Sequence, residues 1–161
     1  MAISWPGHVK DVGGIRNQFH HVIDILPTIL EVTGIPAPQM VNGIRQKPIE
    51  GVSMAYTFDD ATAPSRRDVQ YFEMVGDRAL YQDGWKIVAR HRKGEDFDTD
   101  HWELFRMADD YSEVNDLSVQ NPERVRHMVE RWWQEAERFG VLPLDDREAE
   151  RALDWFRSSA P

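Results

Sequence analysis

Two adjacent histidines and a nearby aspartate, His20, His21 and Asp24, have side chains that could bind a metal ion. Imidazole nitrogens and carboxylate oxygens are common ligands of zinc and other divalent metals. Adjacent residues point in different directions, so at most one of these histidines can share a face with Asp24. We therefore expect the histidines to form hydrogen bonds at the edge of the fold, and we predict no metal ligand in this chain.

A second acidic group, Asp96, Asp98 and Asp100, has the alternating carboxylates that begin a calcium-binding loop. An EF-hand loop that starts at Asp96 would need glycine at its sixth position and glutamate at its twelfth. The chain has His101 and Met107 at those positions. The pattern predicts a solvated, charged hairpin loop.

The same segment, residues 91–101, contains side chains that could contact an anionic substrate. His91, Arg92, Lys93 and His101 give it positive charge and hydrogen-bonding groups. Loops that connect strands often carry binding residues. An exposed polar loop without a specific role is the simpler interpretation, and the residues alone do not decide between the two.

Composition restricts the classes of partner. The 161 residues carry 28 acidic and 19 basic side chains, for a formal charge of −9, which disfavours binding to nucleic acid or to anionic lipid. The sequence contains no cysteine, so disulfides, thiolate catalysis and cysteine-ligated zinc are excluded. It has no apolar run as long as a membrane span and no signal-peptide pattern at its first residues, so we expect a soluble protein.

The first 68 residues predict a strand, a helix and a long loop. Apolar residues at positions 2, 3 and 5, followed by Pro6-Gly7, favour a buried strand whose partner strands are missing. A helix is expected from Asp24 at its N-cap to Gly34 at its C-terminal cap, with Pro27 in the first turn. Residues 35–68 are rich in proline and glycine and show no sustained period, which predicts an ordered loop.

From residue 69 the pattern changes to short strands. Strands are expected over 69–74, 78–82, 85–90 and 102–107, with turns at Gly76-Asp77 and Asp83-Gly84. The first three form an antiparallel meander, and the fourth completes a small sheet that needs a cover.

A helix that can cover this sheet is expected between Asn121 and Gly140, with Pro122 at its first position. Its apolar residues recur at intervals of three and four, so one face should pack on the sheet, with Met128 and Trp132 as the main contacts. A shorter surface helix is expected over roughly 147–156. The predicted fold class is α+β, with a four-stranded antiparallel sheet covered by an amphipathic helix.

Several motifs together resemble the C-terminal portion of type I sulfatases, in particular bacterial arylsulfatases. The motifs that carry the resemblance are Ser4-Trp5-Pro6-Gly7, the segment from Phe19 to Gly34, Gln70-Tyr71-Phe72-Glu73, Asp83-Gly84-Trp85-Lys86, Trp102-Glu103-Leu104-Phe105, Asp116-Leu117 and the segment from Val141 to Arg147. The resemblance implies that residues 1–68 are the end of an alkaline-phosphatase-like central α/β domain and that residues 69–161 are the C-terminal subdomain. It also implies that the loop 91–101 can approach an active-site cleft, which makes His91, Arg92 and His101 candidates for substrate contacts in a complete enzyme.

Sulfatases hydrolyse sulfate esters with a formylglycine made from the first residue of a Cys/Ser-x-Pro-x-Arg motif. Pro64-Ser65-Arg66 is superficially similar, but the arginine follows the serine directly and position 62 is threonine. The family's acidic calcium ligands and the upstream lysine and histidines that hold sulfate are absent as well. The resemblance thus assigns calcium and formylglycine to a missing N-terminal part, no catalytic residue to this chain, and either a cytoplasmic or a periplasmic location.

Two hypotheses of function follow. In the first, the chain is the C-terminal part of an arylsulfatase-like hydrolase that takes aryl or alkyl sulfate esters only when completed, and it is inactive alone. In the second, it is a non-catalytic module that binds itself or another partner through its unpaired strand or its helix face. No serine lies in a context typical of a nucleophile, so an intact esterase or phosphatase is disfavoured.

Overall fold

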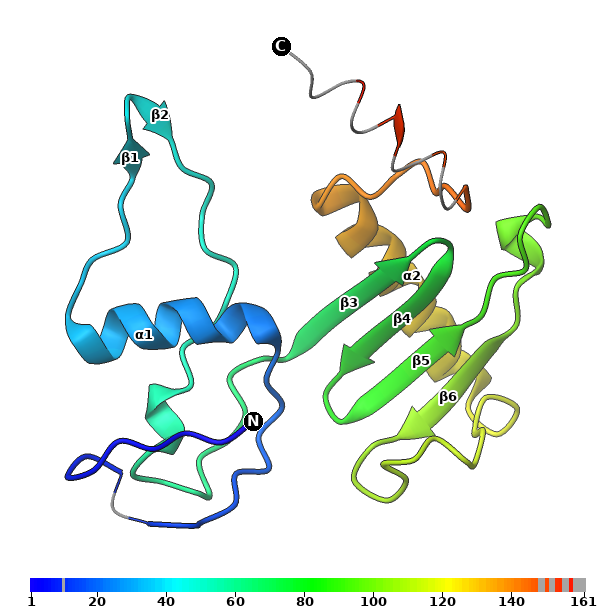
Figure 1. Ribbon diagram of the computed structural model, residues 1–161. Helices are drawn as coiled ribbons and strands as arrows, with labels where there is room; N and C mark the ends of the chain where they lie inside the picture. The colour runs from blue at the N-terminus through cyan, green and yellow to red at the C-terminus, as the bar shows by residue number, and fades with distance from the viewer. Residues whose placement is uncertain (10, 148–149, 151–152, 155–156, 158–161) are drawn as a thin grey trace. The chain divides into compact units, whose positions relative to one another are not determined.

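A computed structural model describes residues 1–9, 11–147, 150, 153–154 and 157 of the chain (Figure 1). It divides into two compact units, Met1–Arg67 and Asp68–Pro161. The short helix expected over roughly 147–156 falls mostly outside the described residues. No helix among the described residues is long and apolar enough to cross a lipid bilayer.

Helix α1 (Ile25–Thr33) is the main regular element of the first unit and follows a 3-10 turn at Val22–Asp24. Asp24 is its N-cap residue, and Gly34 ends it with a φ of 67° in the left-handed region, where glycine carries no steric penalty. The predicted limits of this helix are therefore confirmed. Ile25, Leu26 and Ile29 are exposed on one face of α1, and Thr28 is buried on the other.

The remainder of the first unit differs from the prediction in two places. Residues 2–5 form no strand and residues 1–4 are exposed, because no strand among the described residues pairs with them. The segment expected to be a continuous loop contains a short antiparallel hairpin of β1 (Met40–Val41) and β2 (Ile44–Arg45), and a 3-10 turn at Ala55–Thr57.

The second unit is the predicted antiparallel sheet. Its strands are β3 (Val69–Met74), β4 (Asp77–Gln82), β5 (Trp85–Ala89) and β6 (Trp102–Arg106), and they lie in the order β3-β4-β5-β6. Asp83 and Gly84 form the second tight turn, as predicted. The first turn is formed by Val75 and Gly76, one residue earlier than expected, because β4 already begins at Asp77.

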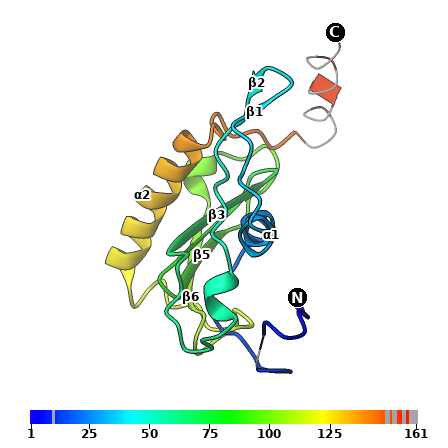
Figure 2. The same ribbon diagram turned by 90° about the vertical axis from the view of Figure 1, so that its left-hand side faces the viewer.

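Helix α2 (Pro122–Arg138) covers one face of this sheet, as Figures 1 and 2 show. Its apolar stripe places Met128, Trp132 and Ala136 against Leu80, Ile87 and Leu104, and these six side chains form the buried core. The indole Nε1 of Trp132 also donates to the carbonyl oxygen of Phe72 at 3.0 Å. The α+β fold with a helix on an antiparallel sheet is therefore confirmed.

Candidate functional site

The candidate loop connects β5 to β6, and both of its ends are fixed by the sheet. Ala89 and Trp102 are paired in the antiparallel register, so residues 90–101 project from one end of the second unit. A 3-10 turn, Phe97–Thr99, lies within the loop and is capped by Asp96, whose carboxylate accepts from the backbone N–H of Asp98 at 3.0 Å. The loop is therefore an ordered element with its own local hydrogen bonds.

His91 lies at the beginning of this loop, and its side chain is only 1% exposed. Its Nδ1 is 2.9 Å from Oδ2 of Asp100, and its Nε2 is 3.4 Å from Oδ2 of Asp146. Its ring stacks on Phe97 with centroids 3.9 Å apart. His91 is therefore enclosed between two carboxylates and an aromatic ring.

Arg78, on β4, is the buried cation beneath the loop. Its guanidinium forms an ion pair with Asp100 and donates to the carbonyl oxygen of Phe97 at 3.0 Å. Its side chain is 1% exposed and lies among the rings of Phe97, Trp102 and Trp132. Arginine is suited to such a position because its planar cation can stack on aromatic faces while it donates to a carboxylate.

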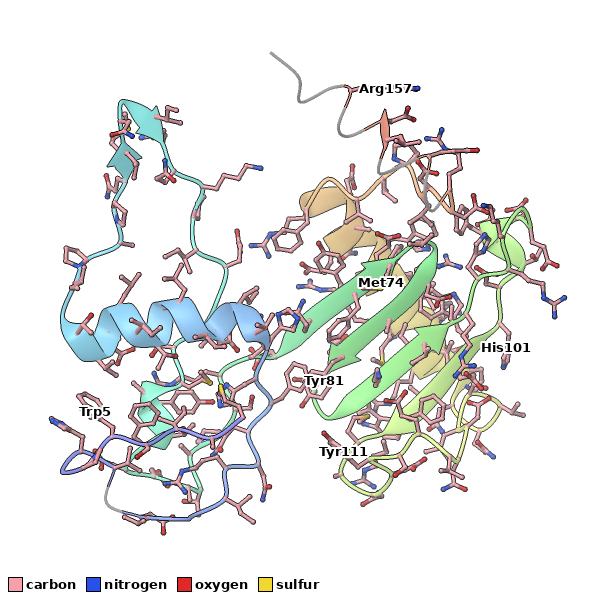
Figure 3. The ribbon with its side chains drawn as sticks, in the orientation of Figure 1. Trp5, Met74, Tyr81, His101, Tyr111 and Arg157 are labelled. Atoms are coloured by element: carbon pink, nitrogen blue, oxygen red, sulfur yellow. The ribbon has the colours of Figure 1, made fainter. Side chains whose placement is uncertain are left out.

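Arg92 and His101, the other two predicted contact residues, lie on the surface. The Arg92 side chain is 86% exposed and is 3.5 Å from Glu95, and the His101 side chain is 71% exposed and is 3.5 Å from Asp116. Figure 3 shows His101 at the end of the loop, beside the start of β6. The structure thus leaves the side chains of Arg92 and His101 accessible to a ligand, whereas that of His91 is enclosed.

Asp146 reaches the loop from the segment that follows α2. Its Oδ2 accepts from the backbone N–H of Gly94 at 2.6 Å and also faces Nε2 of His91. The hydrogen bond from Gly94, followed by the interaction with His91, holds the pKa of the Asp146 carboxyl below its ordinary value of 3.8. Asp146 is therefore a charged acceptor at neutral pH.

Asp24, the residue considered above as a metal ligand, belongs to a separate polar cluster in the first unit. Its carboxylate is fully buried and accepts from the backbone N–H groups of His21 and Val52, each at 2.8 Å. Arg67 donates to the same carboxylate, with Nε 3.0 Å from Oδ2. His20 approaches at 3.7 Å.

These interactions determine the electrostatics of the cluster. Burial alone would raise the pKa of Asp24, but the hydrogen bonds from Arg67, His21 and Val52 outweigh it and lower that pKa. Burial also lowers the pKa values of His20 and His21 below 6.5, against the opposing charge of Asp24. Asp24 therefore acts as an ionised acceptor that is already occupied by donors.

Neither group of acidic residues is arranged to hold a cation. Asp96 caps the 3-10 turn and Asp100 is paired with Arg78, so two of the three carboxylates in the calcium-like pattern have other partners. Across the described ranges, no group of three or more histidine and carboxylate side chains has the arrangement of a metal site.

Comparison with known proteins shows which proteins this chain is similar to. No family model matches it. An uncharacterized sulfatase of Schizosaccharomyces pombe (strain 972) is 29% identical over 152 residues, which are 92% of this chain and 26% of the relative. The chain resembles the C-terminal portion of a sulfatase. It spans about a quarter of the length of the curated relative it matches.

Solved structures share the fold of the chain. The crystal structure of Ps i-CgsB matches 98% of this chain and 32% of its own, with a TM-score of 0.63 and 18% identity. The structure of BT4656 in complex with its substrate D-glucosamine-2-N,6-O-disulfate matches 78% of this chain and 25% of its own, with a TM-score of 0.53 and 16% identity. At these identities the likeness concerns the fold alone.

Sequence reasoning located the loop but missed the groups that hold it. Arg78, Asp100 and Asp146 come from a strand, a loop and a post-helix segment, and their spacing along the chain predicts no contact. One usable signal was present at Arg78, a charged residue at an inward-facing position of a strand. A buried arginine requires a nearby anion, so this position could have indicated a paired carboxylate.

Proposed function

We propose that this chain forms the C-terminal part of a sulfuric ester hydrolase and that it does not hydrolyse sulfate esters by itself. The observation that carries the proposal is the similarity of 92% of the chain to only 26% of a sulfatase. The amino-acid sequence agrees with it. A chain without cysteine cannot make formylglycine from cysteine, and its serines are not in the corresponding motif.

Among the described residues, the serine and the carboxylates that resemble ligands of the family's cofactors have other partners. Ser65, the serine of the partial motif, has its hydroxyl 3.3 Å from the carbonyl oxygen of Arg67, and the carboxylates of Asp24 and Asp100 are bound by arginines. Calcium and formylglycine would therefore belong to another part of the enzyme, and no catalytic step is assigned to a residue of this chain.

In the complete enzyme, the loop 91–101 would contribute substrate contacts. Arg92 and His101 are accessible and can donate hydrogen bonds to anionic or hydroxyl oxygens of an aryl or alkyl sulfate ester. His91 is enclosed, so its contribution would be to hold the loop in place. Domains 1–68 and 69–161 would then be the end of the central domain and the C-terminal subdomain.

The exposed face of α1 supports the proposal that the catalytic part binds there. Ile25 is 38%, Leu26 52% and Ile29 51% exposed, and Met54 is the buried apolar side chain of the first unit among the described residues. A unit with so little apolar core gains stability when such a face is covered. Because the matched sulfatase is about four times as long as the matched region, the occupant we propose is the remainder of a sulfatase domain.

A non-catalytic, self-associating module is the second candidate, and the same exposed face of α1 favours it. Under that proposal the face is covered by a second copy of the chain. Light scattering during size-exclusion chromatography distinguishes the two, because a module of this kind forms a dimer without any other chain.

The decisive experiment is hydrolysis of a chromogenic aryl sulfate by the purified 161-residue chain, with added calcium and a buffer control. We expect no turnover above the buffer control. Saturable turnover that one substitution abolishes would contradict the proposal, because the chain would then contain its own catalytic groups.

A further inference from the structure

The loop between β5 and β6 is held in different ways at its ends and at its tip. His91 and Asp100 face each other across its two ends, with Nδ1 and Oδ2 2.9 Å apart. The tip contains Arg92 and Gly94, and a turn closes it through a hydrogen bond from the N–H of Glu95 to the carbonyl oxygen of Arg92 at 3.0 Å. The end contacts determine where the loop leaves the sheet, but they do not determine where its tip lies.

The contact that reaches the tip comes from Asp146. Its Oδ2 accepts from the N–H of Gly94 at 2.6 Å, two residues beyond the exposed Arg92. Gly94 has a φ of +82°, a conformation that residues with a side chain rarely adopt. A residue with a side chain at position 94 would therefore strain the backbone at the point that Asp146 contacts.

The same oxygen of Asp146 also faces Nε2 of His91 at 3.4 Å, so one carboxylate contacts the tip and one end of the loop. His91 is in turn held at its other ring nitrogen by Asp100, so Asp146 approaches a ring that is already fixed in place. Hydrogen bonds to ionised acceptors are stronger than neutral ones.

Asp146 is itself fixed to the core of the second unit. The segment that carries it begins where the N–H of Val141 donates to the carbonyl oxygen of Ala136 in α2 at 2.8 Å, and Val141 and Leu144 pack against the buried core. The tip of the loop is thereby connected to the end of α2 through a short and anchored segment.

We propose that Asp146 is a positioning residue that fixes the tip of the loop 91–101, and with it the direction of the Arg92 side chain. The role given to Arg92 rests on the proposed function, because there Arg92 contacts a sulfate ester. The claim that Asp146 fixes the tip of the loop does not depend on that function.

The test uses the full chain and two variants at Asp146. Asp146→Ala removes the acceptor, and Asp146→Asn keeps a neutral one of the same size. We expect the amide of Gly94, observed by NMR, to exchange with solvent about tenfold faster or more in Asp146→Ala and to be affected less in Asp146→Asn. The control is Asp145→Asn, whose carboxylate bonds to Arg147 at 2.7 and 2.8 Å and which should leave Gly94 unchanged.

Unchanged Gly94 exchange in Asp146→Ala, with the sheet amides also unchanged, would overturn the proposal. If the whole second unit exchanges faster in Asp146→Ala, the Asp146→Asn variant decides, since it keeps the shape of the site and should still exchange faster at Gly94 than the original chain.

A titration of p-nitrophenyl sulfate, followed by the amide signals of Arg92 and Gly94, separates this proposal from the proposed function. We expect binding to be several-fold weaker in Asp146→Ala than in the original chain. If the original chain shows no response, the substrate role of the loop falls, whereas the Gly94 exchange still decides whether Asp146 fixes the tip. Equal binding with faster exchange would show that Asp146 holds the loop without serving a ligand, which would overturn the link to Arg92.

Discussion

Asp24 and Arg67 form a buried ion pair that joins the start of α1 to the last residue of the first unit. The Asp24 side chain is fully buried and that of Arg67 is 7% exposed, although 43 positions separate them in the chain. Val52 and His21 donate to the same carboxylate, so one side chain connects three segments. This unit, which has little apolar core, is held largely by polar contacts.

We predict that Arg67→Met lowers the free energy of unfolding of the first unit by about 3–5 kcal/mol, because it leaves the Asp24 carboxylate buried without its charged partner. Urea unfolding followed by amide resonances of the first unit measures the effect. The matched control is Arg45→Met on β2, an exposed position where the same replacement should cost less than about 0.5 kcal/mol. A loss below about 1 kcal/mol at Arg67 would show that the ion pair does not hold the unit.

Acid should destabilise the first unit in two stages. The pKa values of His20 and His21 are lowered from 6.5, chiefly by burial, so the unfolded state binds more protons there and stability falls as the pH drops below 6.5. Burial favours a higher pKa for Asp24, but its hydrogen bonds outweigh burial and lower the pKa of the folded state from 3.8. The stability that the ionised Asp24 contributes is therefore present above pH 3.8 and is lost as the pH falls through the lower pKa of the folded state. A pH series of amide exchange in α1 measures both. His20→Gln should weaken the first stage and leave the second.

Trp132 should be the most sensitive position of the second unit. Its side chain is fully buried, and its N–H donates to Phe72, so Trp132→Ala should cost about 3–5 kcal/mol. Trp132→Phe keeps most of the apolar contact but loses the donor, and it should cost less. Chemical denaturation measures both, with Val119→Ala as a control at a residue that is 84% exposed. Equal costs for the two variants at Trp132 would indicate that its hydrogen bond dominates.

His91 and Arg92 are neighbours whose replacement should change stability by very different amounts. His91→Ala removes a buried ring between two carboxylates and should lower stability by about 2 kcal/mol or more. Arg92→Ala alters a side chain that is 86% exposed and should change stability by less than about 0.5 kcal/mol. Thermal unfolding gives these values, and binding of p-nitrophenyl sulfate should be reduced by Arg92→Ala without loss of folding. If His91→Ala is as stable as the original chain, residues other than His91 anchor the loop.

The exposed face of α1 predicts association that depends on Leu26 and Ile29. Changing both to serine removes apolar surface that lies in solvent, so it should reduce binding of a hydrophobic dye and any self-association seen by light scattering. The paired control is Thr33→Ser, an exposed change on the same helix that removes little apolar surface. If the original chain is a monomer, this face does not mediate self-association, and failure to bind the dye would show that it offers no accessible apolar patch.

Much of the fold was predictable because its signals are local. The Asp83-Gly84 turn, the alternation in the four strands and the capping residues of both helices each depend on a few neighbouring residues. The β1–β2 hairpin was missed even though Asn42-Gly43 is a strong two-residue turn signal, because its strands have two residues each and show no alternation. The strand expected at residues 2–5 failed for another reason, since a strand requires a partner.

The candidate site was predictable only in part. The sequence indicates a charged loop with accessible cations, and Arg92 and His101 are accessible. It does not indicate that His91 is enclosed, because the enclosing groups, Asp100 and Asp146, are separated from it by nine and 55 positions along the chain and are brought together by tertiary packing. Asp24 is a similar case. The sequence places it beside two histidines, but its partner in the fold is Arg67, 43 positions away.

The turn between β3 and β4 limits which substitutions the loop 91–101 can accept during evolution or engineering. At Gly76 a side chain would meet the His91 ring, since an added Cβ would lie 2.8 Å from Cδ2 of His91. A larger residue at Gly76 would therefore displace the His91 ring and disturb its contact with Asp100, whereas the four residues from Arg92 to Glu95 are exposed. A different segment could replace residues 92–95 while Gly76, His91 and Asp100 are kept. The same fold could then acquire new ligand preferences by exchange of a short segment.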